Sequence, residues 1–194
     1  MGFTREELLA AAGKSVPDLL GPRTDLLFVG INPGLWTAAA QAHFAKRGNR
    51  FYQALHRAGL SNRLIDAADG LEAGDADDLT SRGIGITNLV NRATARADEL
   101  GAGELVDGAR LLAIKAMTLQ PKVTVILGLT AYRIGFARPR ARAGWQEEKL
   151  GGADLLVAGN PSGLNAHQTV DDLAASFREA ALGAGLRPAS NQPN

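Results

Sequence analysis

Short apolar runs alternate along this chain with stretches of helical periodicity. The apolar runs are nearly continuous, which is typical of strands buried on both faces of a parallel sheet. They predict strands over residues 24–29, 83–90, 123–127 and 155–158. Apolar residues at helical spacing predict helices near residues 51–58, 104–119, 131–136 and 170–182. The alternation predicts an α/β fold, a three-layer α/β/α sandwich on a mostly parallel central sheet.

The connecting segments are less regular. Thr4 and Glu7 form a capping-box pattern, which predicts a short first helix. Residues 137–152 are rich in Arg, Gly and Pro, and we expect a loop there with a short edge strand. The acidic stretch 66–78 is weakly patterned and residues 34–49 are expected to be a loop, so no element is predicted in either.

The length of the chain fits one domain. No internal repeat or long linker divides the 194 residues, of which 45% are hydrophobic. We therefore expect a single domain over residues 1–194, with its core in residues 17–182 and a frayed tail from residue 183.

Composition excludes several classes of protein. No apolar run approaches the roughly 18 residues of a membrane span, and the first residues lack the pattern of a secretory signal. The absence of cysteine excludes disulfides, thiolate zinc sites and iron–sulfur clusters, and three widely spaced histidines disfavour a metal site. We expect a cytoplasmic monomer that needs no metal and no cofactor.

The net charge of +1 hides an uneven distribution. Six acids and no base lie in residues 66–78, whereas residues 133–142 hold four arginines and no acid. Lys46, Arg47 and Arg50 form a second basic group. Local basic patches in a chain of nearly zero net charge are typical of a protein that binds a polyanion on one face. Ordinary solvated surface charges give the same composition.

Two polar, glycine-containing loops each follow a predicted buried strand. Residues 30–34 read Gly-Ile-Asn-Pro-Gly, and residues 160–164 read Asn-Pro-Ser-Gly-Leu. Ligands of open α/β sheets bind outside the carboxyl ends of the strands, so we expect both loops to face one crevice. The first loop has neither a dinucleotide fingerprint nor the Gly-Lys-Ser/Thr ending of a P-loop.

Single residues of these loops allow more than one interpretation. Asn32 can orient a water molecule, or it can simply stabilise a turn. Phe44, beside basic residues, can stack on a planar base, or it can pack in the core. Leu164, after a glycine, can insert between stacked bases, or it can cover the core.

Through these residues taken together, the chain resembles the mismatch-specific uracil/thymine-DNA glycosylases. These enzymes are the double-strand-specific branch of the uracil-DNA glycosylase superfamily. The resemblance covers about residues 17–182 and rests on the two loop motifs, on Phe44, on residues 49–51 (Asn-Arg-Phe), and on the blocks at residues 83–92 and 108–112. It implies base excision repair: a hydrolase that removes uracil from G·U-type mismatches of double-stranded DNA by base flipping.

The resemblance also implies residue roles. Asn32 would position the water that attacks the sugar. The base-binding pocket would be formed by Ile31, Thr37, His43, Phe44, Asn88 and Thr94. The wedge and the contacts to the widowed base would come from Asn160, Pro161, Ser162, Gly163, Leu164 and Asn165. Phosphate contacts are expected from Lys46, Arg47 and His167.

Some positions depart from the bacterial branch. Asn88 stands where that branch often has Lys, Asn91 where relatives often have an acid, and Asn165 where an Arg is typical. These departures leave open whether thymine, ethenocytosine, hypoxanthine or oxidised cytosines are also substrates. They also motivate an alternative function, a protein on the same fold that binds damaged or abasic DNA without cleaving it. A third possibility is an α/β protein that binds a nucleotide or free base.

Overall fold

Five strands form one central sheet in the computed structural model, which describes residues 2–163 and 168–189. The strands are β1 (Leu26–Gly30), β2 (Ile84–Asn88), β3 (Val123–Leu127), β4 (Gly144–Trp145) and β5 (Asp154–Ala158). Their spatial order is β2-β1-β3-β5-β4. The first four strands in this order run parallel, and β4 pairs antiparallel with β5 at one edge.

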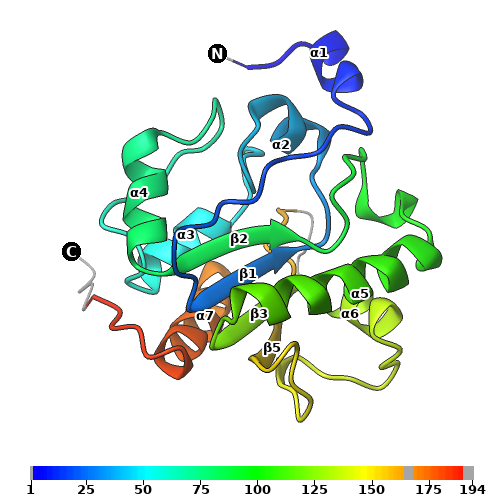
Figure 1. Cartoon of the computed structure of the whole chain (residues 1–194). Coiled ribbons are helices and arrows are strands. Elements are labelled where there is room, and N and C mark those ends of the chain that lie inside the picture. The colour runs from blue at the N-terminus through cyan, green and yellow to red at the C-terminus, as the bar shows by residue number, and fades with distance from the viewer. Residues whose placement is uncertain (1, 164–167, 190–194) are drawn as a thin grey trace.

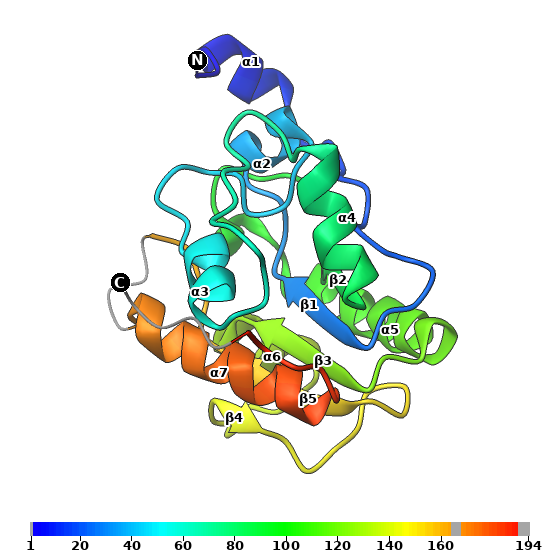
Figure 2. The same cartoon turned by 90° about the vertical axis from the view of Figure 1, so that its left-hand side faces the viewer.

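Helices cover both faces of the sheet (Figures 1 and 2). They are α1 (Arg5–Ala10), α2 (Leu35–Ala40), α3 (Phe51–Arg57), α4 (Ala73–Ser81), α5 (Ala102–Leu119), α6 (Leu129–Gly135) and α7 (Val170–Gly183), with a short 3-10 helix, η1, at Ala97–Glu99. Helices α3, α4 and α7 contribute to the core on one face, and α5 and α6 form the core on the other.

The pleat of the strands explains this layering. In β1, Leu26 and Phe28 belong to the core under α3 and α7, whereas Leu27 and Val29 belong to the core under α5 and α6. Successive side chains of a strand point to opposite faces, so both faces must be apolar when both are covered. The predicted three-layer α/β/α fold is therefore confirmed, including the short edge strand within residues 137–152.

Two α-helices lie where no element was predicted. Helix α2 occupies part of the expected loop 34–49, and α4 overlaps the acidic stretch 66–78. Neither helix has a side-chain cap at its start, and α4 buries only Asp75 and Leu79, so local patterns were weak in both cases.

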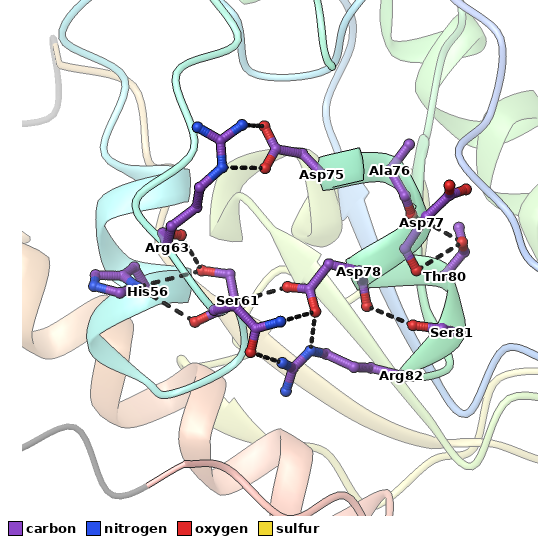
Figure 3. A network of polar contacts seen from close by, with 11 residues as sticks. His56, Ser61, Arg63, Asp75, Ala76, Asp77, Asp78, Thr80, Ser81 and Arg82 are labelled. Carbon is purple, nitrogen blue, oxygen red and sulfur yellow. Dashed lines mark hydrogen bonds and ion pairs between the residues drawn. The ribbon is translucent and has the colours of Figure 1, made fainter. Parts of the chain in front are cut away.

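Ion pairs from outside α4 hold its acids (Figure 3). Arg63 binds the Asp75 carboxylate with two nitrogens, each 2.9 Å from an oxygen. Arg82 binds Asp78 at 2.9 Å, and the Asn62 amide group donates to the same carboxylate at 2.7 Å. The acids of α4 are thus held by two residues before the helix, Asn62 and Arg63, and by a local i,i+4 pair with Arg82.

The described helices include none that is both long and apolar enough to cross a membrane.

Candidate active site

The two sequence motifs lie at the carboxyl edge of the sheet. Gly30 ends β1 and pairs in register with Asn88, which ends β2. Asn160 is separated from the end of β5 by a single residue, and β3 lies between β1 and β5. Both loops therefore leave the same edge of the sheet, as the motif positions predicted.

The side-chain amide of Asn32 has a defined orientation. Its nitrogen Nδ2 lies 2.9 Å from the Arg92 carbonyl oxygen and 2.7 Å from the Thr94 hydroxyl oxygen. A carbonyl oxygen can only accept, and the Thr94 hydroxyl donates its single proton to the Arg96 carbonyl at 2.6 Å. Both partners therefore require the NH₂ group of Asn32 on this side. The oxygen Oδ1 points away and accepts from no donor in the described part of the chain, so it is available to a water molecule.

The segment that holds Asn32 is itself anchored. Arg92 forms a two-point ion pair with Glu104 near the start of α5, at 2.8 and 3.0 Å. Glu104 also accepts from the Gly101 backbone amide at 3.0 Å. The Arg92 guanidinium and this amide lower the pKa of Glu104 to about 2, so the carboxylate is ionised at neutral pH. The carbonyl that orients Asn32 thus belongs to a residue tied to the longest helix.

A second amide, that of Asn88, is oriented by a buried histidine. His43 Nε2 lies 2.9 Å from the Pro17 carbonyl oxygen, so Nε2 carries the ring proton. Burial lowers the pKa of His43, which keeps the ring neutral and leaves Nδ1 as an acceptor. Nδ1 lies 3.3 Å from Asn88 Nδ2. Asn88 Oδ1 is therefore turned away from His43 and stays an acceptor.

Gly30 leaves room between Asn88 and an aromatic ring. A Cβ atom at Gly30 would lie 2.6 Å from Asn88 Oδ1 and 3.2 Å from two ring atoms of Phe44. Phe44 has a positive φ of 55° and stacks on Phe51, with ring centroids 4.0 Å apart. A non-glycine residue in this backbone conformation is uncommon, and such positions cluster at functional sites. An acceptor oxygen and an aromatic ring thus converge above the end of β1.

Arg50 connects the two halves of the site. Its backbone amide donates to the Pro161 carbonyl at 2.9 Å, and its guanidinium donates to the backbone carbonyls of Gly163 and Gln168. A Cβ atom at Gly163 would lie 2.8 Å from the Gly48 carbonyl oxygen, so only glycine permits this approach. The segment before α3 and the second motif are therefore in direct contact.

The second motif contains a local turn. Asn160 Oδ1 accepts from the Ser162 backbone amide at 2.9 Å, which is the hydrogen bond of an Asx turn. Pro161, between them, is buried. Leu164, Asn165 and His167, predicted to contact DNA, lie outside the described residues.

The remaining predicted residues lie around this centre. Ile31 is half-buried and packs against Gly128, at the start of α6. Thr37 is buried in α2, just after the first motif. Lys46 and Arg47 are exposed on the loop before α3. Thr94, predicted to line the pocket, accepts a hydrogen bond from the amide of Asn32.

Trp36 is turned toward other parts of the chain. Its indole nitrogen donates to the Ala68 carbonyl at 2.8 Å, and its ring packs edge-on against Phe3. Its ring is therefore engaged within the protein.

Sequence reasoning missed three supporting residues: Arg50, Arg92 and Glu104. Arg50 belongs to a basic group and Arg92 to the family block at residues 83–92. The sequence does not show that the Arg50 side chain binds a loop or that the Arg92 side chain binds a helix. Their partners lie far away in the sequence, so only the folded chain reveals them.

Within the described residues, no group of three or more His, Cys, Asp or Glu side chains could hold a metal ion.

An α/β sheet with polar loops and two oriented amides at its carboxyl edge defines a ligand-binding site of the doubly wound type. The family model of the Uracil DNA glycosylase superfamily matches residues 17–182, and the chain belongs to this superfamily. A solution NMR structure from Methanosarcina acetivorans, described as a candidate uracil DNA glycosylase, matches with a TM-score of 0.59 and 18% identity. The match covers 87% of this chain and 98% of that one, and at this identity it supports the fold. Family membership supports a role as a DNA glycosylase, a hydrolase of DNA repair.

Proposed function

We propose that this protein is a mismatch-specific, monofunctional uracil-DNA glycosylase. It hydrolyses the N-glycosidic bond of uracil opposite guanine in double-stranded DNA. The observation that carries this proposal is the orientation of Asn32, whose amide nitrogen is held by Arg92 and Thr94 while its oxygen is left to accept from water. Asn32 lies in the loop that follows β1, in the first family motif.

The target nucleotide must leave the duplex before it can react. Extrusion costs a few kcal/mol, and the cost is lowest for a mismatched base, which favours a G·U pair over a matched pair. The second motif supports this step, because Arg50 holds it beside the segment that carries Phe44. Leu164 is the residue we expect to fill the vacated space, by the family resemblance.

The chemistry needs an oriented nucleophile more than a strong base. As the bond from C1′ to the base breaks, its electron pair goes to the base and the sugar gains cationic character. Asn32 Oδ1 accepts a hydrogen bond from a water whose oxygen attacks C1′, and the surplus water proton passes to solvent. The leaving uracil anion takes a proton from solvent. Neither motif contains a carboxylate, so we expect modest turnover.

Asn88 and Phe44 are suited to bind the extruded base. Uracil presents an N3–H donor on its Watson–Crick edge, and cytosine presents an acceptor there. His43 takes the NH₂ group of Asn88 and leaves the acceptor oxygen Oδ1 for the base, so the network favours uracil over cytosine. Phe44 supplies an aromatic face for stacking.

No lysine is placed to form a Schiff base. The ammonium groups of Lys115, Lys122 and Lys149 form ion pairs with aspartates. Lys14 and Lys46 lie outside both motifs. We therefore propose hydrolysis without strand cleavage.

The test is excision from end-labelled duplexes that contain one G·U, A·U or G·T pair, and from the same uracil strand without a complement. The proposal predicts fastest excision from G·U, with strand breaks only after alkali treatment. Strand breaks without alkali, or a covalent complex trapped by borohydride, would contradict the monofunctional mechanism. Equal rates on single-stranded DNA would contradict the assignment to the double-strand-specific branch.

A further inference from the structure

The arginine-rich segment before β4 lies at the carboxyl edge of the sheet. β4 runs antiparallel to β5, with Gly144 opposite Val157 in the fourth position of β5. The chain therefore enters β4 from the carboxyl edge of β5, where Asn160 begins the second motif. We call residues 138–142 the arginine loop.

Two of the four arginines in this region brace the loop. Arg133, on α6, donates from two nitrogens to the Ala141 carbonyl, at 2.9 and 2.7 Å. Arg138 donates to Glu148 Oε1 at 2.8 Å, and the buried Tyr132 donates to the same oxygen at 2.6 Å. The arginine loop is thus tied to α6 at one end and to Glu148 at the other, which restricts its conformation.

The other two arginines have no role in this bracing. Arg140 and Arg142 are exposed, and across the residues that the structure describes neither guanidinium forms a hydrogen bond or an ion pair. Most of the other arginines are bound to carboxylates, such as Arg63, Arg82 and Arg92. A braced loop that presents two unneutralised cations is suited to bind an anion with little further loss of conformational entropy.

The acidic residues of α4 lie at the opposite edge. Helix α4 ends three residues before β2 begins, so its acidic residues lie toward the amino edge of the sheet. In Figure 1, α4 lies on the side of the sheet from which β1 and β2 start, and α6 lies toward their arrowheads. The positive charges of the arginine loop therefore share an edge with the two motifs, which favours approach of a polyanion from that side.

We propose that Arg140 and Arg142 form a phosphate-contacting surface for duplex DNA, additional to the one expected at Lys46 and Arg47. The identity of the polyanion rests on the proposed function. The contact is to the phosphate backbone of the DNA, so it contributes to DNA affinity whatever the base sequence and whether or not a base is damaged.

The test is equilibrium binding of a fluorescent, undamaged duplex between about 50 and 200 mM salt. Removing one side chain that neutralises a phosphate reduces the slope of log K against log salt by about 0.9. The double variant Arg140→Ala/Arg142→Ala should therefore reduce the slope by about 2. It should also lower the affinity for undamaged and for G·U duplexes by the same factor. Arg110→Ala, which removes an exposed arginine of α5, should leave the slope unchanged.

A second variant separates charge from loop structure. Arg140→Lys/Arg142→Lys keeps both charges and should keep the wild-type slope, because counterion release depends on neutralised phosphates. Three results would overturn the proposal. They are an unchanged slope in the double alanine variant, a reduced slope in the double lysine variant, and a wild type whose duplex binding does not depend on salt. Because binding to undamaged DNA needs no excision, a catalytically inactive protein with the predicted slopes would refute the glycosylase function and leave this surface standing.

Discussion

Asn32 Nδ2 lies 2.7 Å from the Thr94 hydroxyl oxygen, and this contact fixes which end of the Asn32 amide faces the open side of the loop. Thr94 can act in this way because its proton is already given to the Arg96 carbonyl. Thr94 is thus suited to act as a positioning residue for the proposed nucleophilic water, in addition to its predicted place in the base pocket.

Thr94→Val should slow excision with little effect on DNA binding. The substitution keeps the shape of the side chain and removes the acceptor, while the Arg92 carbonyl still holds the amide. A net hydrogen bond contributes about 0.5–1.5 kcal/mol, so we expect single-turnover excision to fall by roughly 3- to 10-fold. Thr94→Ser restores the hydroxyl and should recover most of the rate. An unaffected rate in Thr94→Val would show that the hydroxyl does not orient Asn32.

Asn88→Ala should weaken the recognition of the base edge. We expect wild-type protein to excise N3-methyluracil much more slowly than uracil, because the methyl group removes the donor that Asn88 Oδ1 would accept. In Asn88→Ala, uracil excision should fall by about 10- to 100-fold, since an unpaired buried polar group costs about 1–3 kcal/mol. The ratio between the two substrates should shrink in the variant. An unchanged ratio would indicate that Asn88 does not contact N3.

The strands and motif positions could be predicted because the signals are local. The apolar run of β3 was predicted with its observed bounds, and Asn32 and Asn160 lie just beyond strand ends. Helix α4 was not predictable from its sequence, because it depends on Arg63, twelve residues before Asp75, to pair with its acids. Local periodicity carries no information on such tertiary ion pairs.

The supporting residues of the site were hidden for the same reason. Arg92 and Glu104 are twelve residues apart, on a loop and on a helix, and only the fold brings their side chains together. The resemblance to a family identified the groups expected to contact DNA. It did not reveal that Thr94 and His43 each orient an asparagine.

Stability should depend on Glu104 at acidic pH. Its pKa is lowered from an ordinary value of 4.5 to about 2 by the Arg92 guanidinium and the Gly101 amide. A depressed pKa contributes stability that is present above the unfolded value and is lost as pH falls through the folded value. The free-energy difference of unfolding between wild type and Glu104→Gln should therefore be constant above about pH 5 and shrink between pH 4.5 and about 2.

Urea unfolding at a series of pH values measures this difference. Glu147→Gln is the matched control, because Glu147 is exposed and its carboxylate has no hydrogen bond or ion pair among the described residues. A Glu104→Gln difference that stays constant down to pH 2 would contradict the account of the Arg92–Glu104 pair.

Uracil should be excised faster than thymine by a finite factor. Thr37 is buried in α2 just after the first motif, where the family resemblance predicts contact with the C5 edge of the base. A contact of this kind discriminates by about 1–3 kcal/mol, so the G·U to G·T rate ratio should be roughly 10 to 200. Thr37→Ala should lower this ratio. Equal wild-type rates on the two mismatches would contradict the prediction.

The most direct test of the central claim is single-turnover excision from a G·U duplex by wild type and Asn32→Ala. The account predicts alkali-dependent cleavage by the wild type and a rate lower by about 10²- to 10³-fold in the variant, with DNA binding largely retained. An unaffected rate in Asn32→Ala would remove Asn32 from the chemistry. No excision by the wild type, together with tight binding to G·U or abasic duplex, would identify a damage-binding protein instead.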